Sequence, residues 1–141
     1  APLAKIPEFT DAQLTECIDA NIASTFRMTR AAWPHLSRAG GTIVNISSLA
    51  SVDPFAGFAV YGACKTWINA FTSAAANEGR AARIRVFAVA PGAVETRMLR
   101  QHFPDFPADA TLAPDEIAAA VSRCFDIELD DKLGQVIFVK K

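Results

Sequence analysis

The chain has 141 residues, is about half apolar and carries a net charge of −1. Its length suits one ordinary domain with a real core. Because acidic and basic residues are mixed along the chain, a dedicated nucleic-acid binder is not expected. No apolar run is long enough to span a bilayer, and the opening APLAKIPEFT lacks the apolar segment of a signal peptide.

The cysteines and histidines do not have the spacing of a metal site. Cys17, Cys64 and Cys124 are far apart and form no CxxC pair, and His35 and His102 lie near prolines in turn-like surroundings. Each cysteine lies in an apolar helical context, which favours reduced, buried thiols and a cytoplasmic location. We therefore expect no bound metal.

The first third of the chain predicts a long helix followed by a buried strand. Thr10 and Gln13 have capping-box spacing, and apolar residues recur at helical intervals over residues 11–37. Gly40 and Gly41 are expected to end this helix. The stretch TIVNIS is β-branched and apolar on both faces, which predicts a parallel-sheet strand over about residues 41–47.

A second helix is expected over about residues 60–78, with Gly79 as its C-cap. RIRVFAV predicts a second strand over residues 83–89, which Pro91 and Gly92 would end. Residues 93–113 have weak periodicity and suit a functional loop such as a lid. Pro114 fits the first turn of a third helix, and QVIFV predicts a last strand over residues 135–139.

The alternation of helices and strands predicts an α/β fold with a doubly wound parallel sheet. Ligands of such sheets bind beyond the carboxyl ends of the strands. Ser48 follows the first strand, and Pro91 and Gly92 follow the second. We expect these residues to meet at one edge of the sheet.

Four polar residues predict chemistry at that edge. Tyr61 and Lys65 are four residues apart and therefore neighbours on one helix face, where an ammonium would lower the pKa of a phenol. Such a phenol can donate or accept a proton near neutral pH. Ser48 could hold a carbonyl oxygen while charge develops on it. Asn21 lies on an otherwise apolar stripe and needs partners, which a backbone distortion or an ordered water could supply.

Each of these features taken alone is more typical of structure than of function. A Tyr–Lys pair usually lies on a solvated helix face, a serine after a strand usually caps a turn, and a lone asparagine is usually a satisfied core residue. The fixed order of the four on elements that converge at one sheet edge is what favours a catalytic interpretation.

In its joint pattern the sequence resembles the C-terminal half of the short-chain dehydrogenase/reductase family. The resemblance rests on Asn21 in DANIASTFRMTRAAWPHL, Ser48 in GGTIVNISSLAS, Tyr61 and Lys65 in YGACK, and the stretch APGAVETRM. It extends from about Thr10 to Val139 and implies a partial Rossmann-like sheet.

The resemblance implies a role for each matching residue. Tyr61 resembles the general acid/base of an NAD- or NADP-dependent oxidoreductase that interconverts an alcohol and a carbonyl. Lys65 is similar to the lysine that lowers the tyrosine pKa and binds the nicotinamide ribose, Ser48 to the residue that holds the substrate oxygen, and Asn21 to the anchor of a water in a proton relay. The segment against the nicotinamide would include Pro91, Gly92, Val94 and Thr96, with Thr96 near its carboxamide.

The chain departs from the family at its N-terminal side. The glycine-rich cofactor turn is absent from its seven glycines, and so is the strand whose neighbour selects NAD or NADP. We therefore expect residues 1–141 to be the C-terminal portion of a single Rossmann-type domain within a longer polypeptide, and the isolated chain to bind cofactor poorly.

Two alternatives to the enzyme interpretation remain. One is an inactive fragment that acts as an interaction or dimerisation module, and a weaker one is a three-stranded domain with unrelated chemistry at Ser48. The family implies a homodimer or homotetramer formed through helices 11–37 and 60–78, with no nucleic-acid or membrane partner. Four phenylalanines in the two loops would suit an apolar alcohol or ketone, or would only pack the loops: Phe55, Phe58, Phe103 and Phe106.

Overall fold

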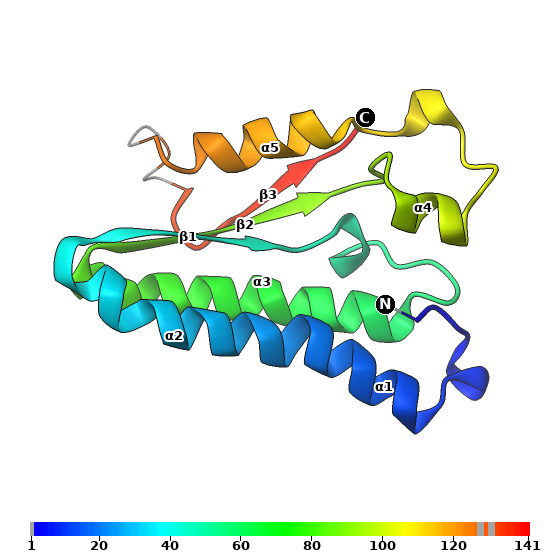
Figure 1. Cartoon of the computed structure of the whole chain (residues 1–141), viewed down its shortest axis with the longest axis horizontal. Coiled ribbons are helices and arrows are strands. Elements are labelled where there is room, and N and C mark those ends of the chain that lie inside the picture. Colours follow the sequence, from blue (N-terminus) through cyan, green and yellow to red (C-terminus); the bar gives the residue numbers. More distant parts are fainter. Residues whose placement is uncertain (1, 127–128, 130–131) are drawn as a thin grey trace.

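The computed structural model describes residues 2–126, 129 and 132–141 as an α/β layer structure (Figure 1). Its main elements follow in the order α1 (Asp11–Ile18), a π-helical turn (Asp19–Ala23), α2 (Ser24–Ala39), β1 (Gly41–Ile46), α3 (Ala59–Gly79), β2 (Ile84–Pro91), α4 (Arg97–His102), α5 (Pro114–Arg123) and β3 (Val136–Val139). The described strands form one parallel sheet in the order β1-β2-β3. The predicted fold class is confirmed.

Helices cover both faces of the sheet, as Figure 1 shows: α1, α2 and α3 lie on one side, and α5 lies on the other. Alternate residues of β2 face the two sides, because successive side chains of a strand point in opposite directions. Ile84 and Val86 pack with α3, and Phe87 and Val89 pack with α5. All four are almost fully buried, so β2 is the centre of the core.

The predicted helix over residues 11–37 is interrupted by the π-helical turn at Asp19–Ala23 and runs on to Ala39. In this turn the N–H of Ser24 donates to the Asp19 carbonyl, one residue further back than in an α-helix. Neighbouring hydroxyls bond the carbonyls of this region, with Ser24 Oγ 2.6 Å from Ala20 O and Thr25 Oγ1 2.6 Å from Asn21 O. Side-chain hydroxyls that bond back in this way bend helices, and periodicity does not reveal them.

Local signals place most helix ends. Thr10 and Gln13 form both bonds of the expected capping box, at 3.2 and 2.9 Å. Gly40 ends α2 with a φ of 80°, as expected for a glycine C-cap. Gly79 is the last residue of α3 rather than its cap; Arg83 takes the left-handed conformation, with a φ of 57°, after a short 3-10 turn.

The remaining corrections are small, except in the segment that follows β2. The predicted strands 41–47, 83–89 and 135–139 become Gly41–Ile46, Ile84–Pro91 and Val136–Val139. The region of weak periodicity, 93–113, contains the short helix α4, which the sequence did not predict. Within the described part of the chain, no helix is both long and apolar enough to cross a membrane.

Candidate active site

The site lies where β1 and β2 end. The Ser47 N–H donates to the Val89 carbonyl at 2.7 Å, and the Gly92 N–H donates to the Val139 carbonyl at 2.8 Å. These bonds hold the carboxyl ends of all three described strands together. The segments after β1 and β2 therefore leave the sheet side by side, which is where parallel sheets bind ligands.

Ser48 and Tyr61 meet at this edge. Ser48 begins the 3-10 turn Leu49–Ser51, and its hydroxyl accepts a bond from the Ala50 N–H at 3.2 Å. A hydrogen bond between the Ser48 and Tyr61 side chains favours the phenolate and draws the pKa of Tyr61 down. The two hydroxyls that the sequence singled out are thus direct neighbours.

Burial nevertheless raises the pKa of Tyr61 above its ordinary value of 10.0, and Cys17 adds to this effect. The expected lowering by Lys65 is therefore wrong for this structure. The Lys65 ammonium donates to the Ile46 carbonyl at 2.9 Å and lies 5.5 Å from the centre of the Tyr61 ring. Because it is partly buried as well, the pKa of Lys65 is itself lowered.

Asn21 lies in the π-helical turn and is 8% exposed. Its Nδ2 donates to the Cys17 carbonyl at 2.9 Å and lies 3.8 Å from Cys17 Sγ. Of the two partners that the sequence analysis considered for a buried asparagine, the structure shows the backbone distortion: Asn21 lies in the π-helical turn, and the Cys17 carbonyl accepts its amide. Among the described residues, the Asn21 side-chain oxygen accepts no hydrogen bond.

Two buried thiols lie behind the polar residues. Cys17 Sγ and Cys64 Sγ are 3.9 Å apart, and both cysteines are free. Burial and the neighbouring Cys17 raise the pKa of Cys64 to about 11, so the Cys64 thiol stays neutral near pH 7. The sequence analysis missed this contact, although Cys64 directly precedes Lys65 and Cys17 lies one turn before Asn21.

A polar network that the sequence analysis also missed joins the end of β1 to α3. Ser47 Oγ donates to Asn69 Oδ1 at 2.5 Å, and Asn69 Nδ2 donates to Ser51 Oγ at 2.9 Å. Thr66 Oγ1 donates to the Ser51 carbonyl at 2.7 Å. These bonds tie the turn after β1 to the helix face that carries Tyr61.

The predicted cofactor segment follows β2 without a break. Pro91 ends the strand, and Val94 forms an isolated parallel bridge with Leu112. The Thr96 hydroxyl donates to the Val94 carbonyl at 3.2 Å and accepts from the Leu99 N–H at 3.2 Å, so it caps α4. Among the described residues, no hydrogen bond joins this segment to Tyr61 or Lys65.

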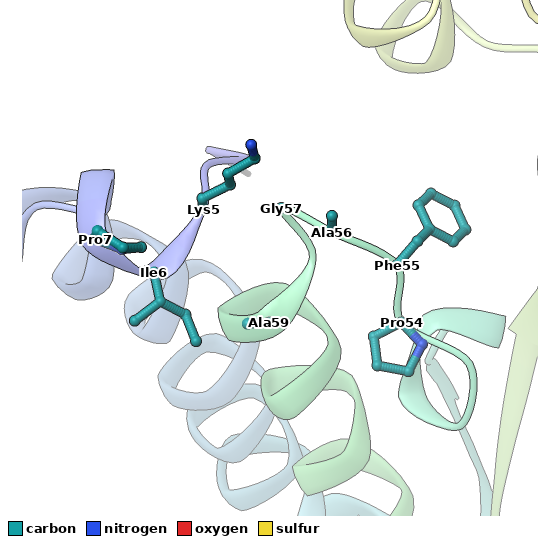
Figure 2. Close-up of a pocket in the computed structure, with 8 residues that line it drawn as sticks. All are labelled: Lys5, Ile6, Pro7, Pro54, Phe55, Ala56, Gly57 and Ala59. Atoms are coloured by element: carbon teal, nitrogen blue, oxygen red, sulfur yellow. The ribbon is translucent and has the colours of Figure 1, made fainter.

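A separate apolar hollow of about 400 Å³ lies in front of α3 (Figure 2). Lys5, Ile6 and Pro7 form one wall, and the loop residues 54–57 form the other. None of the four polar residues lines it. In Figure 2 the ring of Phe55 points away from the Lys5 side of the hollow.

The parallel sheet with helices on both faces (Figure 1) is a Rossmann-like fold. The family model for "short chain dehydrogenase" matches residues 1–106. The chain therefore belongs to the short-chain dehydrogenase family.

Several relatives are reductases by name. Acetoacetyl-CoA reductase of Paracoccus denitrificans is 38% identical over 128 residues, covering 84% of this chain and 53% of the relative. "Dehydrogenase/reductase SDR family member 4" of Oryctolagus cuniculus is 31% identical over 102 residues, covering 72% and 39%. The chain thus spans about half the length of the curated relatives it matches.

Solved structures agree over nearly the whole chain. A "short chain dehydrogenase/reductase family protein" superposes with a TM-score of 0.90 at 32% identity, covering 98% of this chain and 60% of that one. A 3-ketoacyl-(acyl-carrier-protein) reductase from Brucella melitensis, complexed with NADH, superposes with a TM-score of 0.86 at 25% identity, covering 99% and 61%.

Proposed function

We propose that the protein is an NAD- or NADP-dependent oxidoreductase that interconverts an alcohol and a carbonyl. The observation that carries the proposal is that Ser48, Tyr61 and Lys65 meet at the carboxyl ends of the strands, where the Ser48 side chain favours the Tyr61 phenolate and the Lys65 ammonium lies 5.5 Å from the centre of the Tyr61 ring. Relatives named as acetoacetyl-CoA reductases and a neighbour complexed with NADH support it. The substrate would be a small-molecule alcohol or ketone.

The residues present fit the nicotinamide end of such a cofactor. The Lys65 ammonium has three protons and, within the described residues, donates one hydrogen bond, to Ile46; the others are available to ribose hydroxyls. A Cβ on Gly92 would meet the Val139 carbonyl oxygen at 3.7 Å, which is ordinary van der Waals contact, so packing among the described residues does not itself require glycine there. The nicotinamide would lie along the segment that contains Pro91, Gly92, Val94 and Thr96. Thr96 would contribute through the position of this segment, because its hydroxyl already makes two hydrogen bonds, to Val94 and from Leu99. The bound nicotinamide supplies or accepts the hydride.

The chain's own residues would hold the substrate oxygen and move the proton. A carbonyl oxygen placed between Ser48 and Tyr61 would accept a hydrogen bond from each hydroxyl. Because the pKa of Tyr61 is raised, its phenol is protonated at neutral pH and ready to donate to the alkoxide oxygen formed in reduction. After Tyr61 has donated its proton, Lys65 and a water bound to the free side-chain oxygen of Asn21 would supply a new proton to the Tyr61 phenolate.

We also propose that residues 1–141 are the C-terminal portion of one Rossmann-type domain. β1 is apolar on both faces, as a central strand would be, yet it forms an edge of the described sheet. The three free, buried cysteines suit the cytoplasmic location expected from the sequence.

A second candidate, an interaction or dimerisation module, is favoured by the outer face of α2 and α3. Phe26 is 44% exposed there. A groove of about 430 Å³ lies on the same face, with Phe26, Trp33 and Phe71 in its walls. We propose that α1–α2 and α3 join subunits of a homodimer or homotetramer, and native mass measurement of the full-length protein tests this.

Tyr61→Phe in the full-length protein tests the enzyme proposal. We expect turnover to be lost while NADH or NADPH binding, followed by fluorescence titration, stays within a few-fold of wild type. Phe125→Ala serves as a control, since this exposed aromatic lies just after α5. Retained turnover in Tyr61→Phe would exclude Tyr61 as the acid/base and leave the interaction module as the better interpretation.

A further inference from the structure

One phenylalanine packs against the ring of Tyr61, and a second one, from a different segment, stacks on the first. Phe58 directly precedes α3, and its ring packs edge-on against Tyr61, with centroids 5.7 Å apart and an interplanar angle of 86°. Phe103 stacks on Phe58, with centroids 5.9 Å apart and an angle of 28°. Both phenylalanines are half-buried, unlike Phe55, which is 59% exposed. The contact therefore joins the start of α3 to the segment that follows β2.

Arg100 holds Phe103 in this position. Its Nε donates to Glu95 Oε1 at 2.7 Å, and a second guanidinium nitrogen pairs with the other carboxylate oxygen. Its third nitrogen donates to the Phe106 carbonyl at 2.6 Å and to the Pro104 carbonyl at 3.2 Å. One guanidinium thus closes the segment on both sides of Phe103. The loop is shaped by its own contacts before any ligand is considered.

Other bonds support the same arrangement. The Phe103 N–H donates to the Leu99 carbonyl at 2.7 Å, which fixes the phenylalanine at the end of α4. Thr111 Oγ1 donates to the Ala108 carbonyl at 2.7 Å and to Glu95 Oε2 at 3.3 Å. The far end of the segment is therefore tied to the same carboxylate, and the position of Phe103 depends on few free torsions.

We propose that Phe58, which packs on the Tyr61 ring, and Phe103, which stacks on Phe58, determine substrate specificity by forming an apolar wall at the Tyr61 end of the site. The wall selects carbonyl compounds whose substituent next to the carbonyl is uncharged and apolar. This inference rests on the proposed function, because it places the reacting carbonyl at Tyr61. A charged substituent would have to lose its water against the two rings without gaining a partner from them. An alkyl substituent gains by leaving water, with about a four-fold increase in binding per methylene.

The first test follows Tyr61 itself and needs no turnover. The full-length protein, labelled with carbon-13 at the tyrosine Cζ, is titrated by NMR, and Tyr61→Phe assigns the signal. In Phe58→Ala and Phe103→Ala we expect the pKa of Tyr61 to fall towards its ordinary value, because water reaches the phenol. Phe125→Ala is the matched control and leaves it unchanged. An unchanged pKa in both test variants would overturn the wall.

The second test uses 2-alkanones from butanone to octanone as the probe series, with 2-oxo acids of equal length as charged counterparts. Wild type is expected to gain about four-fold in kcat/KM per methylene and to prefer each ketone over its oxo acid. Phe58→Ala and Phe103→Ala flatten this dependence. If an alanine variant fails to fold, Phe58→Val and Phe103→Val replace it, and these smaller side chains are expected to flatten the chain-length dependence in part.

The outcomes separate the two proposals. Turnover in Tyr61→Phe would refute the proposed function. The NMR titration of Tyr61 in Phe58→Ala and Phe103→Ala would still test whether the two phenylalanines keep water from the phenol. Loss of turnover in Tyr61→Phe, with an unaltered slope in the Phe58 and Phe103 variants, leaves the function standing and overturns the wall. A preference for oxo acids, or activity confined to charged substrates, also overturns it.

Discussion

Gly62 lies between Tyr61 and the turn that carries Ser48, and alanine at this position should damage both stability and activity. A Cβ on Gly62 would lie 2.7 Å from the Ala50 carbonyl oxygen and 3.0 Å from Pro54 Cβ. The first contact is with the main chain, so no side-chain rotation relieves it. The turn after β1 and the helix α3 must move apart.

The sign of the stability change follows from two opposing magnitudes. Alanine is favoured over glycine inside a helix by about 1 kcal/mol. Overpacking of a tight contact costs about 1–3 kcal/mol, and two short contacts place Gly62→Ala in the upper part of that range. We therefore expect the free energy of unfolding to fall by about 1–2 kcal/mol, measured by urea denaturation.

The same displacement should reduce turnover. To make room for the new Cβ, the turn that contains Ala50 has to move. The Ala50 N–H in this turn donates to the Ser48 hydroxyl, so Ser48 would be displaced as well. Misplacing a reacting group by about 1 Å costs about 100-fold in rate, so a shift of several tenths of an ångström should lower kcat by about 10-fold or more. The assay is kcat at saturating cofactor and substrate in the full-length protein.

Gly79→Ala is the matched control, because a Cβ there would lie 2.6 Å from the Ile84 carbonyl oxygen at the opposite end of α3. It should lose similar stability and keep the wild-type kcat once folded. The reasoning fails if Gly62→Ala is as stable and active as wild type. It also fails if Gly79→Ala loses as much kcat as Gly62→Ala does.

Two further predictions concern charge at and near the site. Ser48→Ala should raise the pKa of Tyr61 further, because it removes the hydrogen bond that favours the phenolate; carbon-13 NMR of the tyrosine measures this, and a fall would contradict it. The bond from Arg100 holds the pKa of Glu95 below its ordinary value of 4.5. The Glu95–Arg100 pair therefore stabilises the fold above pH 4.5, and this stabilisation is lost as the pH falls through the lowered pKa that Glu95 has in the folded protein. Glu95→Gln should open the segment at neutral pH, seen as faster limited proteolysis, while wild type does so only in acid; equal proteolysis rates at pH 7 would refute this.

The order of the fold could be read from the sequence because its signals are local. β-branched runs, the glycines that follow α2, and the capping box at Thr10 act through neighbouring residues, and each predicts its element without knowledge of the rest. The resemblance then named four polar residues, and the structure brings three of them, Ser48, Tyr61 and Lys65, together at one sheet edge. The fourth, Asn21, is held on the adjoining helix by the main chain of Cys17.

What the sequence could not predict depends on contacts between distant segments. The direction of the Tyr61 pKa shift is set by burial, which depends on residues far away in the chain. The π-helical turn arises from hydroxyl and amide bonds to particular carbonyls and leaves the apolar periodicity almost unchanged. The bonds of Arg100 to Glu95, Pro104 and Phe106 join residues of weak helix and strand propensity. For this reason the sequence predicted only a loop where the structure has α4.

The stretch YGACK combines site chemistry with the closest packing of α3. Tyr61 bonds the serine after β1, Gly62 admits the carbonyl of the turn that follows, Cys64 contacts α1, and Lys65 donates to the last carbonyl of β1. Only Ala63 is exposed. Four neighbouring residues therefore fix one helical turn against three separate elements, and the phenol and the ammonium gain their positions from packing rather than from their own attraction. We expect a site held in this way to be preorganised before ligand binds. Its specificity then has to come from the segments around it, chiefly the one that Arg100 closes.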